Sequence, residues 1–531
     1  MKIPLRPALL AALFIAALAT ASASAAEFPF AGATVEQLQA RMAAGTLTAR
    51  DLTAAYLDRI AEIDRAGPRL NAVIELNPDA LALAATLDTE RRAGRVRGPL
   101  HGIPVLIKDN LDTADRMATT AGSLALVGAL PPRDAHVVAR LRAAGAVILG
   151  KTNLSEWANY RGNNSSSGWS GRGGQTRNPH ALDRSPSGSS SGSAAAVAAD
   201  LCVVAIGTET NGSIISPASA CGIVGVKPTV GLVSRDGIVP IAVSQDTAGP
   251  MTRTVRDAAL VLAAIAGPDA RDPATRAIPP TLADALSAPL PPDALRGARI
   301  GVVRGPFGFH RRMEAMMDTV VAALRAAGAE VVDPVKIPTL GKFSAAQSEV
   351  LSYEFKDGIN RYLAAPGRVT TVKNLADLIA FNDAHRAEEM PFFGQELFLA
   401  AQARGPLTDA AYLEARETCL RLARTEGIDA AMDAGSLDAL VMFSRGTATL
   451  TDPFNGEGGS GSSSSLAAVA GYPSVTVPAA HVSDLPIGLS FVGRAWSEPR
   501  LLALAADFEA RTHARRAPKF PPTAIVAAEA R

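Results

Sequence analysis

The alternation of apolar and polar positions predicts amphipathic helices that begin at recognisable caps. Residues 34–37 have the pattern of a capping box, and an amphipathic helix is expected to follow it. A second helix is expected after Thr48, with its apolar residues on one stripe. A third is expected over 134–144, where Gly145 provides the stop. Helices of this kind need an apolar surface to cover.

Short, uncharged apolar runs between these helices predict that surface as a β-sheet. The runs are 105–107, 146–149, 201–206, 300–303, 440–443, 474–477 and 487–492. Because such strands are apolar on both sides, helices must cover both faces of the sheet. The pattern therefore predicts an α/β fold with a mostly parallel or mixed sheet between helical layers. No clear interdomain linker interrupts it.

Composition supports a large globular domain and argues against a nucleic-acid partner. The chain has 531 residues, of which 48% are hydrophobic and 19% are charged, so it can bury a large core. Its 52 basic and 51 acidic residues give a formal net charge of +1, without a long basic run. Nucleic-acid binding requires clustered positive charge, so no such partner is expected.

The first 26 residues have the pattern of a secretory signal peptide. Lys2 and Arg6 precede an apolar run over 8–19, and small residues follow over 21–26. The apolar run is too short to span a bilayer comfortably. We therefore expect residues 1–26 to be removed and residues 27–531 to be exported to the periplasm or the medium, without stable membrane insertion afterwards.

The cysteines and histidines indicate neither a disulfide framework nor a metal site. The three cysteines, Cys202, Cys221 and Cys419, leave at least one free thiol in an exported chain. Cys202 lies in an apolar run and is expected to be a small buried residue. The seven histidines are scattered, without the spacing of a zinc site. No metal and no cofactor are expected.

Two short motifs match known sites but stand in the wrong context. Residues 145–152 fit the phosphate-binding pattern G-x-x-x-x-G-K-[ST], yet the predicted strand lies between the two glycines, which must share one loop. Residues 188–192 fit the esterase pattern G-x-S-x-G, which requires a hydrophobic strand directly before it, and none is predicted there. With His310 or His385 as its partner, this serine elbow is kept as an alternative hydrolase site.

Three further segments carry residues suited to catalysis. Lys108 follows an apolar strand, where burial would lower its pKa and suit it to a base; it could equally be a lysine that reaches solvent at a strand end. Residues 185–193 form a Gly/Ser loop before a helix, which presents hydroxyls and free N–H groups or simply caps that helix. Residues 207–213 follow a buried strand, where α/β sheets usually carry their chemistry.

Together these segments resemble the signature of the amidase-signature family. They are G-I-P-V-L-I-K-D-N around Lys108, S-P-S-G-S-S-S-G-S around Ser189, and G-T-E-T-N-G-S ending at Ser213, in the family's order and spacing. The stretches N-L-S-E-W-A-N, S-G-W-S, G-G-Q-T-R-N-P and G-L-V-S-R-D-G-I are most similar to bacterial peptide amidases. The resemblance covers residues 27–531 and implies a single large domain, with a twisted mixed sheet covered by helices on both faces.

The resemblance also implies roles for individual residues. Ser213 would be the nucleophile, Ser189 a bridging serine after a cis bond to Gly188, and Lys108 the base. The oxyanion hole would consist of the backbone N–H groups of Thr210, Asn211, Gly212 and Ser213. The implied reaction removes the C-terminal carboxamide of a peptide and gives the free acid and ammonia, with a peptide or small-molecule amide as the partner.

The chain departs from the family pattern at three positions. Ser187 and Ser191 replace glycines, and a positive φ at either one would cost roughly 1–2 kcal/mol. Asn211 stands where many relatives have glycine or aspartate, and asparagine tolerates unusual backbone conformations well enough to preserve the hole.

Several alternatives remain open from the sequence. The substrate could be another small or aryl amide, or the chain could be a non-catalytic exported binding protein on the same scaffold. The ammonia-supplying subunit of a tRNA-dependent amidotransferase is disfavoured by the predicted signal peptide. The aromatic residues within 340–405 either cover the site or belong to an ordinary helical core. The sequence gives no oligomeric state.

Overall fold

The computed structural model describes residues 28–305 and 311–524. The described residues from 32 onward form one compact unit, and residues 28–31, the described part of the preceding unit, include a turn. The predicted signal peptide lies outside the described residues. Among the described residues, no helix is both long enough and apolar enough to cross a membrane.

The predicted helix caps are present. Thr34 and Gln37 form the capping box that opens the first helix, and Thr48 accepts a hydrogen bond from the backbone N–H of Asp51 in the second. The helices are α1 (Val35–Ala43), α2 (Ala49–Arg59), α3 (Ala80–Arg92), α4 (His136–Ala143), α5 (Ser191–Ala198), α6 (Ile215–Ala220), α7 (Val255–Ile265), α8 (Leu282–Ser287), α9 (Arg311–Ala326), α10 (Ser344–Leu363), α11 (Leu375–Ala384), α12 (Arg386–Glu389), α13 (Glu396–Gln402), α14 (Ala410–Leu420), α15 (Ala430–Gly435), α16 (Ser464–Ala470) and α17 (Glu498–Thr512).

An 11-stranded sheet runs through the unit in the order β1-β3-β2-β6-β8-β7-β12-β13-β11-β9-β10. These strands are β1 (Val73–Leu76), β2 (Pro104–Lys108), β3 (Val147–Thr152), β6 (Val204–Glu209), β7 (Val224–Lys227), β8 (Thr247–Thr252), β9 (Arg299–Val302), β10 (Glu330–Val332), β11 (Ala439–Phe443), β12 (Ser474–Val482) and β13 (Leu485–Val492). Strands β3, β2 and β6 are parallel, as are β11, β9 and β10, while the strands between these groups pair antiparallel. The prediction of a mixed sheet is confirmed.

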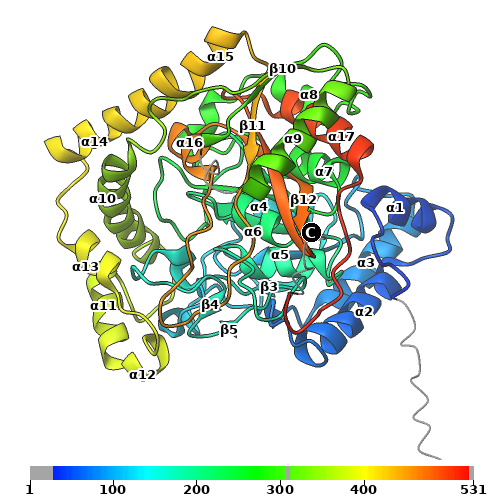
Figure 1. Ribbon diagram of the computed structural model, residues 1–531. Coiled ribbons are helices and arrows are strands. Elements are labelled where there is room, and N and C mark those ends of the chain that lie inside the picture. Colours follow the sequence, from blue (N-terminus) through cyan, green and yellow to red (C-terminus); the bar gives the residue numbers. More distant parts are fainter. Residues whose placement is uncertain (1–27, 306–310, 525–531) are drawn as a thin grey trace, which may run out of the picture. The chain divides into compact units, whose positions relative to one another are not determined.

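Helices pack against both faces of this sheet, as predicted. Helices α5 and α6 contact each other and the central strands, while α7 and α17 form a second pair against β8 and β12. Every residue of α5 is buried, and its residues are small on all sides, Ser191 and Ser193 included. Figure 1 shows helices α1–α3 on one side of the unit and α10–α14 on another.

The sheet differs from the sequence prediction in one strand boundary and in strands that no predicted apolar run marked, among them β1, β7 and β8. The predicted strand 201–206 is displaced toward the C-terminus, so that Thr208 and Glu209 still belong to β6. Strand β8 was not predicted, because its sequence T-A-G-P-M-T lacks an apolar run. A Cβ on Gly249 of β8 would lie 1.9 Å from the carbonyl oxygen of Val226, so this strand needs small residues for close backbone approach.

Strands β2 and β6 position the candidate site. They are parallel neighbours, with Ile107 opposite Ile206, so their carboxyl ends meet at one edge of the sheet. Lys108 ends β2, and residues 210–213 follow directly after β6 at the same edge. This is where open α/β sheets usually bind ligands.

Candidate active site

Lys108 is completely buried at the carboxyl end of β2. Its Nζ lies 2.7 Å from Ser189 Oγ, 2.9 Å from Thr208 Oγ1 and 3.3 Å from the carbonyl oxygen of Thr208. A protonated amine can donate to all three oxygens. A neutral amine has a lone pair, so the Ser189 hydroxyl can then donate its proton to Nζ. The structure therefore brings the predicted lysine and the predicted bridging serine together.

Burial changes the charge state of this lysine. It lowers the pKa of Lys108 from 10.5 to about 7, against the opposing effect of the negative charges of Glu209 and Asp246. The neighbouring Asp109 instead accepts hydrogen bonds from Thr120 and lies 3.4 Å from Arg172. Lys108 is thus substantially uncharged near neutral pH, which a general base requires.

The loop before α5 holds Ser189 in place. The bond between Gly188 and Ser189 is cis, as the resemblance implies. The Ser189 carbonyl accepts the backbone N–H of Ser155 at 3.1 Å. A Cβ at Gly188 would lie 2.2 Å from Ser155 Oγ, so a larger residue there would displace the Ser155 side chain. This packing fixes the loop against the segment that follows β3.

The two serines that replace family glycines differ in conformation. Ser187 has a φ of 60°, the left-handed region in which a side chain is strained. Ser191 is the first residue of α5, and its Oγ donates to the carbonyl oxygen of Ser187 at 2.6 Å. The expected strain is therefore present at Ser187 and absent at Ser191.

Ser213 lies beside this loop and nearer to solvent. The backbone N–H of Ser190 donates to the Ser213 carbonyl oxygen at 3.1 Å. Ser190 is fixed in turn by Thr208, whose carbonyl oxygen accepts from Ser190 Oγ at 3.1 Å. Ser213 is 7% exposed, whereas Ser189 is fully buried. Of the two predicted serines, Ser213 is therefore the one that an entering substrate can reach.

The segment 210–213, for which an oxyanion hole was predicted, carries four backbone N–H groups. Within the described part of the chain, these four N–H groups donate to no protein acceptor. Gly212 has a φ of 82°, and a Cβ there would lie 2.7 Å from Ser464 Oγ. The Asn211 side chain accepts from Ser464 Oγ at 2.8 Å and donates to Ser465 Oγ at 3.1 Å. Asparagine at 211 thus ties the segment to the start of α16.

Both ends of the same segment are fixed by buried carboxylates. Thr210 Oγ1 donates to Asp246 Oδ1 at 2.5 Å. Glu209 Oε2 accepts the N–H groups of Ile214 and Ile215 at 2.8 and 2.9 Å. A loop held at both ends can keep its N–H groups aimed at one point without reorganisation, which electrostatic stabilisation of an oxyanion requires.

Sequence reasoning missed three residues that contact this centre. Thr208 accepts from Lys108, and Asn110 Nδ2 donates to Thr208 Oγ1 at 3.0 Å. Asp246 completes the set through Thr210. Asn110 and Thr208 could have been found from their positions, because both lie in the signature segments that contain Lys108 and Ser213. Asp246 lies outside those segments.

The other candidate motifs do not form sites. Gly150, Lys151 and Thr152 lie within strand β3, and Lys151 Nζ donates to the Leu111 carbonyl oxygen at 2.7 Å, so no phosphate loop exists there. No strand directly precedes the serine elbow, whose central Ser190 binds Thr208. His385 stacks on Phe381 instead, and His310 lies outside the described residues. All three cysteines are buried and free.

Comparisons with known proteins give consistent matches over nearly the whole chain. A family model described as Amidase matches residues 51–502. The native peptide amidase from Stenotrophomonas maltophilia is 56% identical, with a TM-score of 0.88 over 93% of this chain and 99% of that chain. A peptide amidase in complex with the competitive inhibitor chymostatin is also 56% identical, with a TM-score of 0.89 over 92% of this chain and 100% of that chain. A probable amidase of Arabidopsis thaliana is 40% identical over 505 residues, covering 93% of this chain and 92% of the relative.

Proposed function

The chain belongs to the amidase family and is a hydrolase of amide C–N bonds, and from this premise we propose that Lys108, Ser189 and Ser213 form its catalytic triad. The observation that carries the proposal is the 2.7 Å contact between Lys108 Nζ and Ser189 Oγ in a fully buried setting. We further propose that the substrates are peptides with a C-terminal carboxamide, which the enzyme converts to the free acid and ammonia.

The proposed reaction begins with a proton relay. Neutral Lys108 accepts a proton from Ser189, which accepts one from Ser213, and Ser213 Oγ forms a bond to the carbonyl carbon of the amide. The N–H groups of residues 210–213 stabilise the oxyanion; in hydrolases, loss of one such donor costs about 3–4 kcal/mol.

The second half of the reaction returns the protons. Ser189 donates a proton to the amide nitrogen, the C–N bond breaks and ammonia leaves an acyl-enzyme at Ser213. A water molecule then gives up a proton along the same relay and attacks the acyl carbon. The acid leaves, and Ser213 regains its proton.

An aromatic surface supports a peptide as the substrate. Trp169, Phe392 and Phe454 form a chain of edge-to-face contacts, with centroids 5.5 Å apart for the first pair and 5.8 Å for the second. Gly168, next to Trp169, donates its N–H to Ser155 Oγ at 2.9 Å, and Ser155 holds Ser189. We propose that apolar side chains upstream of the carboxamide contact this surface.

The sequence left two roles open for the aromatic residues within 340–405, either in the helical core or as a cover of the site. Phe343, Phe355 and Phe398 are fully buried in core clusters. Phe392 is half-buried and contacts Phe454, which is 69% exposed. The core interpretation holds for most of the segment, and the proposed substrate contact is confined to Phe392.

The decisive experiment measures ammonia release from three amides. These are an apolar peptide carboxamide, the matching free amino-acid amide and an aryl amide. We expect the highest kcat/KM for the peptide. Faster cleavage of the aryl or free amino-acid amide would overturn the peptide assignment, and failure to cleave any of them would favour a non-catalytic binding protein.

The nucleophile is tested separately with a fluorophosphonate that labels activated serines. Ser213→Ala should abolish both turnover and labelling. Ser216→Ala, on the first turn of α6, is the matched control and should keep both. Labelling that persists in Ser213→Ala would assign the nucleophile to another residue.

We also propose that the protein is exported after removal of residues 1–26. The support is the charged, apolar and small-residue pattern of that segment. N-terminal sequencing of the protein from its native cell fraction should give a start near Ala26 or Glu27. An intact Met1 in the cytoplasmic fraction would overturn export and revive the amidotransferase alternative.

A further inference from the structure

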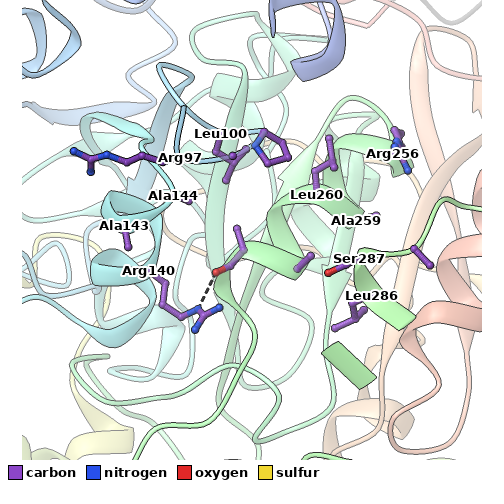
Figure 2. A pocket seen from close by; sticks show the side chains of 15 residues that line it. Arg97, Leu100, Arg140, Ala143, Ala144, Arg256, Ala259, Leu260, Leu286 and Ser287 are labelled. Atoms are coloured by element: carbon purple, nitrogen blue, oxygen red, sulfur yellow. Dashed lines mark hydrogen bonds between the residues drawn. The ribbon is translucent and has the colours of Figure 1, made fainter. Parts of the chain in front are cut away.

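A cavity of about 490 Å³ lies between helices α4 and α7 (Figure 2). Its other walls are residues 97–100 and 286–288. The lining is largely apolar, with Leu100, Leu260 and Leu286 as its largest apolar side chains. A cavity of this size is within the range that binds small organic ligands.

This cavity is distinct from the proposed active site. Residues 97–100 precede β2 and the end of α4 precedes β3, so the cavity lies toward the amino ends of these parallel strands. Lys108 ends β2 at the opposite, carboxyl edge. A ligand in the cavity would therefore not contact the catalytic residues.

Among the described residues, the charged side chains that line the cavity are all arginines. Three arginines line it, and none of the described lining residues is acidic. Arg97 is paired with Glu90, at 2.7 Å between Nε and Oε2, and Arg256 with Glu36, at 2.9 Å between Nε and Oε1. The charges of these two arginines are therefore compensated by carboxylates outside the cavity.

Arg140 is the arginine without such a partner. Its Nε donates to the carbonyl oxygen of Ala264 at 2.8 Å, the bond drawn in Figure 2. Its two Nη atoms find no acceptor among the described residues. A Cβ on Gly267 would lie 3.2 Å from Nη1, so the glycine leaves the guanidinium room.

A half-buried guanidinium without a counter-charge loses part of its hydration and gains no ion pair in return. Burial accordingly lowers the pKa of Arg140, and no carboxylate raises it again. An anion on the free Nη atoms would remove this cost. Because a guanidinium binds a carboxylate through two parallel hydrogen bonds, a carboxylate fits the vacant donors.

We propose that the cavity binds a monocarboxylate with an unbranched apolar chain, such as a medium-chain fatty acid. The carboxylate would lie on the Nη atoms of Arg140, and the chain would lie along Leu100, Leu260 and Leu286. A single charge is inferred because only one of the three arginines is uncompensated. An apolar chain is inferred because the remaining walls offer mainly alanine and leucine side chains.

The test is calorimetric titration of the full chain with decanoate, with 1-decanol as the uncharged comparison. Arg140→Gln should weaken decanoate binding about tenfold or more, because it removes the guanidinium that would donate two hydrogen bonds to the carboxylate. Arg142→Gln is the matched control on the same helix, since Arg142 pairs with Asp115 and Asp134 outside the cavity, and it should bind decanoate like the parent. Ala263→Phe keeps Arg140 but fills the apolar part, and it should also lose binding.

A crystal soaked in ω-bromodecanoate locates the ligand directly. The bromine should lie among the three leucines. Four results would each overturn the proposal. Two concern relative affinity: decanoate binds Arg140→Gln as tightly as the parent, or decanol binds as tightly as decanoate. The others are bromine found only beside Ser213 and no binding at millimolar decanoate. None of these measurements uses enzymatic activity, so they are independent of the proposed function.

Discussion

The hydroxyl of Thr210 donates a hydrogen bond to Asp246 Oδ1 across 2.5 Å. The other oxygen of this carboxylate accepts the N–H groups of Ile241 and Ala242, both at 2.9 Å. Burial raises the pKa of Asp246 to about 6, and its negative charge in turn raises the pKa of Lys108. One carboxylate therefore both positions the proposed oxyanion segment and influences the proposed base.

The first prediction concerns the Thr210 hydroxyl. Thr210→Val keeps the shape but removes the hydrogen bond to Asp246, which leaves the N–H groups of residues 210–213 less firmly oriented. We expect kcat to fall about tenfold, the equivalent of one buried hydrogen bond, with little change in KM. Thr210→Ser keeps the hydroxyl and should be close to the parent. A Val variant with unchanged kcat would show that the bond does not position the hole.

The second prediction concerns the pH dependence of catalysis. Because the proposed base must be neutral and the pKa of Lys108 is about 7, kcat/KM should rise with pH and reach half its maximum near pH 7. Asp246→Asn removes a negative charge that favours the protonated lysine, so the midpoint should move to lower pH. Profiles of kcat/KM from about pH 5 to pH 9 test this. A midpoint that stays fixed or moves upward would contradict it.

The third prediction concerns stability. The folded pKa of Lys108, about 7, lies below its ordinary value of 10.5, so between these two values the unfolded chain binds more protons than the folded one. This lysine therefore makes the free energy of unfolding increase with pH across that window, and the contribution is constant below it.

Lys108→Met removes this contribution. We expect the variant to be more stable than the parent at about pH 7, and the difference to shrink by about 1.4 kcal/mol per pH unit as pH rises. Urea unfolding at several pH values measures both proteins. Buried Lys227 is present in both proteins, so its contribution to the pH dependence of stability cancels in the comparison. A difference that is independent of pH would mean that Lys108 is not desolvated as described.

The sequence predicted those parts of the site that depend on local pattern. Lys108 could be placed at the end of a strand because five apolar residues precede it, and the Gly/Ser loop could be placed at a helix start because alanines follow. The contact between Lys108 and Ser189 could be predicted only from the family resemblance. No local pattern joins two residues that are separated by 81 positions in the chain.

The parts that were missed depend on tertiary contacts. Asp246 precedes β8, a strand without an apolar run, and its role follows from pairing between β6 and β8. The shift of β6 by a few residues has the same origin, because pairing with β8 extends the ladder to Glu209. Backbone partners can thus define a strand where side-chain hydrophobicity does not.

The last prediction compares the two serines that replace family glycines. At a φ of 60°, Ser187 costs roughly 1–2 kcal/mol relative to glycine, whereas glycine loses about 0.5–1 kcal/mol more entropy on folding. Ser187→Gly should therefore raise the free energy of unfolding by about 0.5–1 kcal/mol. Ser191→Gly should lower it by about 1–2 kcal/mol, because it weakens α5 and removes the hydrogen bond to Ser187. Urea denaturation of the two variants and the parent measures the sign of both changes in the free energy of unfolding. Equal destabilisation by the two substitutions would show that the left-handed backbone at Ser187 carries no strain.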